Sequence, residues 1–301
     1  MKQIVVLSGK GGTGKTTVTA ALAHLASEDP GTRAILVDAD VDAANLELLL
    51  APQIVETHEF VGGQTATITA DVCSGCGLCA EVCRFDAVRV DNGLYTVDAM
   101  ACEGCAACKT QCPNNAITLL PQISGRWFSS TTRYGPLFHA RLSPAQESSG
   151  KLVTLLKQQA CAHAEEENYP LMIVDGPPGI GCPAIAAVSG ADLVIVVTEP
   201  TAAGIHDMRR VLDLTAHFGI QSLVCINKAD LYPAGTDTII EYCQQNGQPV
   251  IGQLSFDLSI TEAMVHGQTI TAYLPDSPIS HALRAIWQDA WASVHEKAAV
   301  E

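Results

Sequence analysis

A glycine-rich loop near the start of the sequence places the strongest constraint on the fold. Residues 8–17 read SGKGGTGKTT and contain the pattern G-x-x-x-x-G-K-T. The loop follows a predicted strand and precedes a predicted helix, so backbone N–H groups and a helix N-terminus can surround a phosphate. We expect Lys15 to reach the β- and γ-phosphates and the Thr16 hydroxyl to bind Mg²⁺. The other loop residues expected at the nucleotide are Gly9, Gly11, Gly12, Thr13, Gly14 and Thr17. An ordinary glycine-rich turn is the alternative, and the flanking strand and helix disfavour it.

Short apolar runs alternate with helical stretches along most of the chain. The runs lack polar alternation, which is typical of strands buried on both faces. They lie at 3–7, 33–37, 171–174, 193–197, 223–226 and 250–254. Helices are expected at 16–26, 150–165, 205–217, 236–245 and 279–296. This order predicts an α/β fold with a doubly wound, mostly parallel sheet, in which ligands bind at the carboxyl ends of the strands.

Eight of the twelve cysteines form two runs of identical spacing, the second 29 residues after the first. The first run is Cys73, Cys76, Cys79 and Cys83, and the second is Cys102, Cys105, Cys108 and Cys112. Such runs are typical of ferredoxins with two clusters, in which the fourth ligand comes from the other run. We therefore expect one [4Fe–4S] cluster on Cys73, Cys76, Cys79 and Cys112, and a second on Cys83, Cys102, Cys105 and Cys108. Zinc favours ligands in pairs, and regular clustered cysteines disfavour a disulfide framework.

Lys10 distinguishes the glycine-rich loop from an ordinary phosphate loop. Residues 10–16 match K-G-G-x-x-G-K-[ST], and the chain resembles the deviant-loop ATPases of the MinD, ParA and Mrp type and the nitrogenase iron protein. The resemblance implies that Lys10 binds nucleotide and reaches across a nucleotide-sandwiched dimer to the partner's phosphates. It also implies catalytic roles for Lys10, Lys15 and Asp40. A solvated surface lysine is the alternative for Lys10.

Acidic residues at the ends of two predicted strands extend the resemblance. Asp38 and Asp40 end the second strand, and Asp175 opens the segment DGPPG after the third. In the family, the first Asp orders the site near Mg²⁺ and the second positions the attacking water, while the Asp of the later segment holds the water shell of the metal. We therefore expect Mg²⁺ to be held by Thr16, Asp38, Asp40 and Asp175.

The segment from Asn227 to Asp230, NKAD, follows a further predicted strand. The resemblance implies that Asn227 contacts the base. The pattern N-K-x-D also reads guanine in GTPases, so GTP is the alternative, but the Lys10 signature favours ATP and ADP.

Charge and composition limit the partners. The formal net charge is −15, which gives no electrostatic footprint for nucleic acid or anionic lipid. The last predicted helix and the residues after it carry Asp289, Glu296 and Glu301 with few cations, unlike a basic membrane-binding helix. We expect no nucleic-acid or membrane partner. Because the sequence enters a strand directly, without a signal segment, we also expect a cytoplasmic protein.

These observations predict three segments and one leading function. A P-loop ATPase domain at 1–61 and 122–301 is interrupted at 62–121 by an α+β ferredoxin-like module. We expect a dimer, formed with a second copy or with a paralogue, that hydrolyses MgATP and couples nucleotide state to electron transfer through two clusters to a redox partner protein. The alternative is a metal-cluster assembly factor of the Mrp type that serves a cluster acceptor. The absence of a C-x-x-C pair outside residues 73–112 disfavours it.

Overall fold

The computed structural model describes residues 1–144 and 150–296 and divides them into two compact units. The first unit comprises residues 1–57, 127–141 and 150–296, and the second comprises residues 58–126 and 142–144. The second unit contains both cysteine runs and extends a few residues beyond each end of the predicted insert. Glu301, used above against a membrane-binding terminus, lies outside the described residues.

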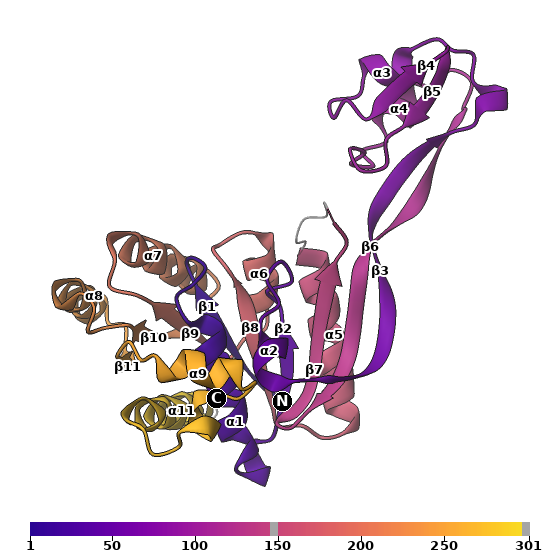
Figure 1. Ribbon diagram of the computed structural model, residues 1–301. Coiled ribbons are helices and arrows are strands. Elements are labelled where there is room, and N and C mark those ends of the chain that lie inside the picture. Colours follow the sequence, from indigo (N-terminus) through magenta and orange to yellow (C-terminus); the bar gives the residue numbers. More distant parts are fainter. Residues whose placement is uncertain (145–149, 297–301) are drawn as a thin grey trace. The chain divides into compact units, whose positions relative to one another are not determined.

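A nine-stranded sheet has the order β11-β10-β9-β1-β8-β2-β7-β6-β3 (Figure 1). Its strands are β1 (Lys2–Ser8), β2 (Ala34–Asp38), β3 (Gln53–Ile68), β6 (Ile117–Thr132), β7 (Gly135–Leu142), β8 (Leu171–Pro178), β9 (Leu193–Thr198), β10 (Gln221–Asn227) and β11 (Val250–Leu254). The central strand β1 runs parallel to both β8 and β9, and parallel pairing continues from β9 to β10 and β11 and from β8 to β2 and β7. The expected mostly parallel α/β fold is confirmed.

Helices cover both faces of this sheet. One group is α1 (Lys15–Ser27), α2 (Leu46–Leu50), α9 (Ser259–Val265), α10 (Ile270–Tyr273) and α11 (Pro278–Glu296). The other is α5 (Gly150–Glu166), α6 (Cys182–Val188), α7 (Ala202–His217) and α8 (Pro233–Gln245). In the first group α1 contacts α2, α10 and α11; in the second α5 contacts α6, and α7 contacts α8 (Figure 1). A short 3₁₀ turn, η1 (Pro30–Thr32), leads into β2. None of the helices in the described ranges is both long and apolar enough to cross a membrane.

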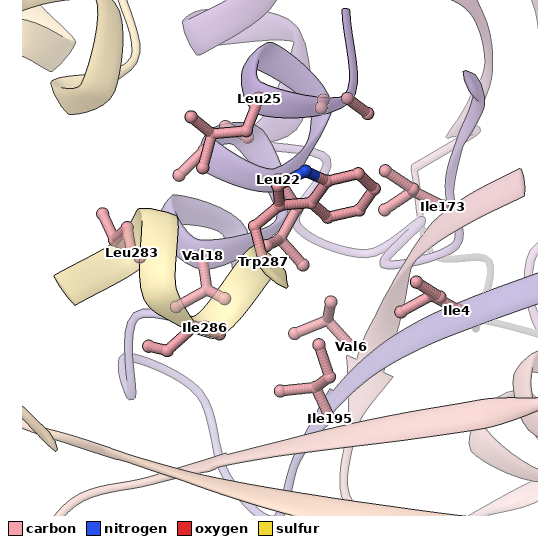
Figure 2. Close-up of a cluster of buried hydrophobic side chains, with 14 of the residues drawn as sticks. Ile4, Val6, Val18, Leu22, Leu25, Ile173, Ile195, Leu283, Ile286 and Trp287 are labelled. Atoms are coloured by element: carbon pink, nitrogen blue, oxygen red, sulfur yellow. The ribbon is translucent and has the colours of Figure 1, made fainter. Parts of the chain in front are cut away.

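The main core lies between the central strands and the pair α1 and α11 (Figure 2). Ile4 and Val6 of β1 face this core, and Val5 between them is equally buried, because successive strand side chains point to opposite faces. The apolar runs in the sequence are continuous for this reason. The helices contribute Val18, Leu22, Leu25, Leu283, Ile286 and Trp287.

Three strands of the nine-stranded sheet, β3, β6 and β7, were not expected from the sequence. The first seven residues of β3, from Gln53 to Glu59, are all exposed, so this edge strand carries no buried apolar run. The sequence of β6 contains Pro121, which cannot donate a ladder hydrogen bond and usually argues against a strand. A two-residue connection, Arg133 and Tyr134, joins β6 to its neighbour β7 as a hairpin.

The second unit contains short elements only, apart from its share of β3 and β6. They are η2 (Ala70–Val72), α3 (Leu78–Glu81), β4 (Val88–Asp91), β5 (Leu94–Val97) and α4 (Ala107–Gln111). Strands β4 and β5 pair antiparallel across Asn92 and Gly93, which both have positive φ, as a type I′ turn requires. This agrees with the expectation of short segments and no long helix.

The packing of α1 predicts a large cost for losing one side chain. Leu22 of α1 is fully buried against the sheet and α11. Leu22→Ala should therefore lower the free energy of unfolding by about 2–5 kcal/mol. Leu48→Ala is the matched control, because Leu48 is 57% exposed and should change stability by less than about 0.5 kcal/mol. Denaturant unfolding measures both variants, and equal losses would contradict the assigned core.

Candidate functional site

The glycine-rich loop connects β1 to α1, and Asn227 holds it by a hydrogen bond. Gly12 and Gly14 have φ of 78° and 92°, values that favour glycine. A Cβ on Gly14 would lie 2.2 Å from Nδ2 of Asn227, which donates to the Thr13 carbonyl oxygen at 2.8 Å. The Thr13 hydroxyl is buried and has no hydrogen-bond partner among the described residues. A buried polar atom of this kind fits a loop built around a polar ligand.

The other expected loop residues differ in their surroundings. Gly9 packs so closely on α7 that an added Cβ would lie 2.2 Å from Cβ of Asp207. Gly11 is exposed, and Thr17 is half-buried in the first turn of α1. The structure therefore gives Gly9 a packing reason to be glycine, whereas the roles of Gly11 and Thr17 at the nucleotide stay predictions.

The four predicted magnesium ligands meet beside the start of α1. Asp38 and Asp175 are paired positions on the neighbouring parallel strands β2 and β8. Lys15 Nζ lies 2.9 Å from Asp175 Oδ1 and 3.3 Å from Asp40 Oδ2. Thr16 donates from Oγ1 to Asp175 Oδ2 at 2.7 Å. The carboxyl ends of β2 and β8 thus bring Lys15, Thr16 and the acidic residues into one site.

The charges in this site do not balance. The carboxyl groups of Asp38, Asp40 and Asp175 share the single cation of Lys15. Burial and the neighbouring Asp175 raise the pKa of Asp38 well above its usual value, and burial also raises the pKa of Asp40. Burial alone would lower the pKa of Lys15, but Asp175 and Asp40 outweigh it and raise that pKa. Excess negative charge among oxygen ligands suits a hard divalent cation, so these residues fit Mg²⁺.

Lys10 is held by residues of its own chain. Its ammonium group makes an ion pair with Oε1 of Glu199 and lies 3.4 Å from Oγ1 of Thr201. Glu199 Oε2 also binds Lys228 Nζ at 3.2 Å. Burial would raise the pKa of Glu199, but hydrogen bonds from the two lysines lower it below its usual value. The expected reach of Lys10 into a partner subunit therefore requires release from Glu199.

The segment from Asn227 to Asp230 holds the glycine-rich loop, and its contact with a base stays a prediction. Lys228 donates from Nζ to the Gly12 carbonyl oxygen at 3.1 Å, beside the bond from Asn227. Asp230 Oδ1 accepts from the backbone N–H of Phe256 at 2.6 Å. This bond ties the carboxylate to the loop after β11 and disfavours the guanine-reading role considered above.

Three site residues were missed by the sequence reasoning. Thr19 is fully buried and donates from Oγ1 to Asp175 at 2.9 Å; its position four residues after Lys15, on the same helix face, was the available signal. Glu199 follows β9 at a strand end, where ligand contacts concentrate, and Lys228 follows Asn227. Glu199 makes ionic contacts with Lys10, 189 residues away, and with Lys228, 29 residues away, and no local pattern indicates them.

Two cavities in the second unit are each lined by four cysteines. One cavity is lined by Cys73, Cys76, Cys79 and Cys112, with Ile68, Leu78, Tyr95 and Ile117 among its walls. The other is lined by Cys83, Cys102, Cys105 and Cys108, with Phe85 and Val88. These are the same two groups of cysteines that the spacing selects. Among the described residues, no cysteine is in a disulfide.

The backbone around the cavities repeats with the cysteine runs. Positive φ occurs at Gly75 and Gly77 in the first loop and, 29 residues later, at Gly104 and Ala106 in the second. Backbone N–H groups also point at the sulfurs, from Ala87 to Cys83 at 3.4 Å, from Ala116 to Cys112 at 3.3 Å and from Ala66 to Cys102 at 3.5 Å.

The cysteine-lined cavities and the N–H groups that face sulfur indicate which kind of metal group the second unit could hold. Among residues 1–144 and 150–296, no three His, Cys, Asp or Glu side chains are placed to hold a metal ion. The cysteines surround two cavities instead, and N–H donors that face sulfur stabilise thiolates. This donor set fits a cluster with separate iron corners; its role as a ligand set stays a prediction.

The buried carboxylate of Asp38 predicts an unusual pH dependence. An unfolded Asp titrates near pH ~4, whereas folded Asp38 keeps its proton to higher pH, so stability from this group falls as pH rises through the folded pKa. We expect Asp38→Asn to raise the free energy of unfolding of the nucleotide-free chain at neutral pH by about 1 kcal/mol or more and to flatten this dependence.

Denaturant unfolding at several pH values measures this effect. Asp237→Asn, on the exposed face of α8, is the matched control and should leave stability within about 0.5 kcal/mol. An Asp38→Asn chain that is less stable than the wild type at neutral pH would contradict the assigned electrostatics.

Comparisons with known proteins place the chain in a family. A model of the CobQ/CobB/MinD/ParA nucleotide-binding domain matches residues 4–270. An uncharacterized protein of Methanocaldococcus jannaschii is 33% identical over 226 residues, 75% of this chain and 78% of that protein. An uncharacterized ATP-binding protein of the same organism is 27% identical over 289 residues, 94% of this chain and 85% of that protein.

A solved structure shows the same fold. The septum site-determining protein MinD of Pyrococcus horikoshii, complexed with Mg-ADP, matches with a TM-score of 0.58 and 18% identity over 96% of this chain and 95% of that chain. With the family model matched from residue 4 to residue 270, and with the loop, the strand-end carboxylates and the parallel sheet in place, the chain belongs to the CobQ/CobB/MinD/ParA family of P-loop nucleotide-binding proteins.

Proposed function

We propose that this chain is a dimeric MgATPase whose nucleotide state controls electron transfer through two [4Fe–4S] clusters. The observation that carries the proposal is the presence in one chain of the nucleotide site and of two cavities that are each lined by four cysteines. A P-loop protein does not need the cavities to hydrolyse ATP, and a ferredoxin does not need the nucleotide site to carry electrons. Coupling gives one chain a use for both.

At the nucleotide, the chain's own groups bind, orient and balance charge. Lys15 and the loop N–H groups neutralise the phosphates, and Thr16, Asp38 and Asp175 hold the metal and its water shell. Asp40, 13% accessible at its side chain, orients the water that attacks the terminal phosphate. Bound Mg²⁺ supplies positive charge at the phosphate oxygens as the bond to the leaving group breaks.

Dimer formation completes this site in the proposal. Lys10 is 31% accessible at its side chain and is held by Glu199 and Thr201. Exchange of Glu199 for a partner's phosphates keeps a negative group beside the ammonium and makes a second subunit necessary for hydrolysis. The second subunit is another copy of this chain or a paralogue.

The inserted segment, residues 62–121, is the proposed electron carrier. Its cysteines would hold the clusters in the two groups that line the cavities, and bound clusters would supply one-electron transfer. The N–H groups of Ala66, Ala87 and Ala116 stabilise the sulfur charge, and the apolar walls limit access of water. A redox partner protein would receive the electrons.

The test compares reduction of an artificial acceptor by the anaerobically purified, reduced dimer with MgATP, with MgADP and without nucleotide. We expect a change of roughly tenfold between the ATP and nucleotide-free states, the size of an ordinary coupling free energy. Lys10→Ala should still bind ATP but lose the response, and Lys2→Ala, which breaks a surface pair with Asp192, is the control. Equal rates in all nucleotide states would refute the coupling. Loss of iron to an apo-acceptor on ATP hydrolysis would point to cluster assembly instead.

The two cysteine groups make a separate prediction about iron content. Wild-type protein should hold about eight irons per chain, and Cys76→Ala or Cys105→Ala should each reduce this to about four. Cys161→Ala is the matched control and should leave the content unchanged, because Cys161 lies on α5 in the first unit. Iron analysis and electron paramagnetic resonance measure the result, and full iron content in both cavity variants would contradict the ligand sets.

A further inference from the structure

The two cavities of the second unit have walls built from equivalent positions of the cysteine repeat. The first cavity contains Cys73 and the second Cys102, and the other cysteines of the two walls also correspond 29 residues apart. The correspondence extends beyond the cysteines, since Ala116 lies in the wall of the first cavity and Ala87 in the wall of the second. Each cavity is therefore a reference for the other, and the residues that differ show how the two sites depart from equality.

Neutral hydrogen-bond donors are closely matched between the two cavities. The Ala87 nitrogen lies 3.4 Å from a cysteine Sγ of the second cavity, and the Ala116 nitrogen lies 3.3 Å from one of the first. The second cavity has a further donor in the Ala66 N–H, 3.5 Å from a cysteine Sγ. The first has Tyr95, whose hydroxyl oxygen is 3.1 Å from where a Cβ on Gly77 of the cysteine loop would lie. Donors of this kind stabilise negative charge on sulfur, and their similar number favours neither site.

Apolar cover of the two cavities is matched as well. Leu78 lines the first cavity and is 38% exposed, and Phe85 lines the second and is 43% exposed. Exposure to water is one of the factors that set the reduction potential of an iron–sulfur cluster. With one large apolar side chain of similar exposure in each wall, this factor does not separate the two sites.

Charge is the property that the two walls do not share. Glu103 lines the second cavity directly after Cys102, whereas the equivalent position of the first cavity is Ser74. Among the described residues that line the two cavities, Glu103 is the only Asp, Glu, Lys or Arg. Other charged residues close to the cysteine runs belong to neither wall, namely Asp71, Glu81, Arg84, Asp86 and Lys109. The second site thus has a carboxylate where the first has a neutral hydroxyl.

A carboxylate in a cavity wall lowers the electron affinity of the site. Reduction of a [4Fe–4S] cluster adds one electron, and so one negative charge, without a bond being made or broken. The Glu103 carboxylate repels that charge, and a full charge acts more strongly than the neutral hydroxyl at the equivalent position. Water and salt weaken the repulsion, because Glu103 is exposed, but its place next to Cys102 keeps it within a Debye length of ~8–10 Å. The second site should therefore bind an electron less tightly than the first.

We infer that Glu103 makes the two cavities unequal electron sites, so that a [4Fe–4S] cluster in the second cavity is harder to reduce than one in the first. A single electron, supplied by an external one-electron donor and destined for a redox partner protein, then resides at the first cavity. The inference rests on the proposed function, because it needs a cluster in each cavity, but it needs no effect of ATP. Glu103 acts through its charge and is not a ligand.

The test is a redox titration of the anaerobically purified full-length chain, free of nucleotide and loaded with about eight irons, followed by electron paramagnetic resonance. In the wild type we expect two one-electron steps that differ about tenfold in electron affinity, or ~59 mV. Cys76→Ala and Cys105→Ala, which should each keep one cluster, assign the steps to the cavities. Glu103→Ser copies the first cavity and should raise the lower step several-fold in electron affinity, and Ser74→Glu should lower the upper step by a similar factor.

Glu81→Gln is the matched control, because Glu81 is an exposed carboxylate two residues after Cys79 that belongs to neither wall. It should leave the separation of the steps within about twofold of the wild-type value. A fully loaded wild type with coincident midpoints, or a wild-type separation that persists in Glu103→Ser, would overturn this inference alone. A chain that binds no iron would refute both proposals. A separation that depends on Glu103, without any effect of ATP on acceptor reduction by the same preparation, would sink the proposed coupling and leave the inference standing.

Discussion

The buried pair of carboxylates at the ends of β2 and β8 is the interaction on which the nucleotide site depends. Asp38 and Asp175 are paired in register on adjacent strands, where like charges ordinarily repel each other. Lys15, Thr16 and Thr19 of α1 surround Asp175, and backbone N–H groups of residues 40 and 46 surround Asp38. Residues of the sheet, of the first helix and of the loop after β2 therefore meet around these two buried carboxylates. The excess negative charge makes the carboxylates repel one another when no ligand is bound. The positive charge of a bound metal ion would reduce this repulsion.

The cysteine segment depends on a different kind of constraint. One buried cluster in it contains Ala66, Cys79 and Ile117, with partly buried neighbours around them. A core this small contributes little stability by itself, and small domains commonly rely on metals for the remainder. Three residues with positive φ, Gly77, Gly104 and Ala106, line the cavities. Backbone geometry and thiol chemistry, rather than apolar packing, shape this part of the chain.

The sequence predicted those features that leave a local pattern. Strands buried on both faces leave continuous apolar runs, and all six expected strands are present. The phosphate loop and the strand-end carboxylates have fixed residue types at fixed spacing, so their convergence beside Lys15 followed from the expected fold. The exposed edge strand β3 and the strand β6 with Pro121 leave no such pattern. Contacts such as that of Lys10 with Glu199 depend on how distant segments meet, which propensity and spacing do not encode.

The central place of β1 in the sheet has a consequence for the order of synthesis and folding. Strand β1 pairs on either side with β8 and β9, which begin at residues 171 and 193. The chain from β1 to β8 must therefore be made before β1 has any neighbour in the sheet. Contacts of such long sequence separation slow folding. Until then the apolar residues of β1 are open to chaperones and to other unfinished chains.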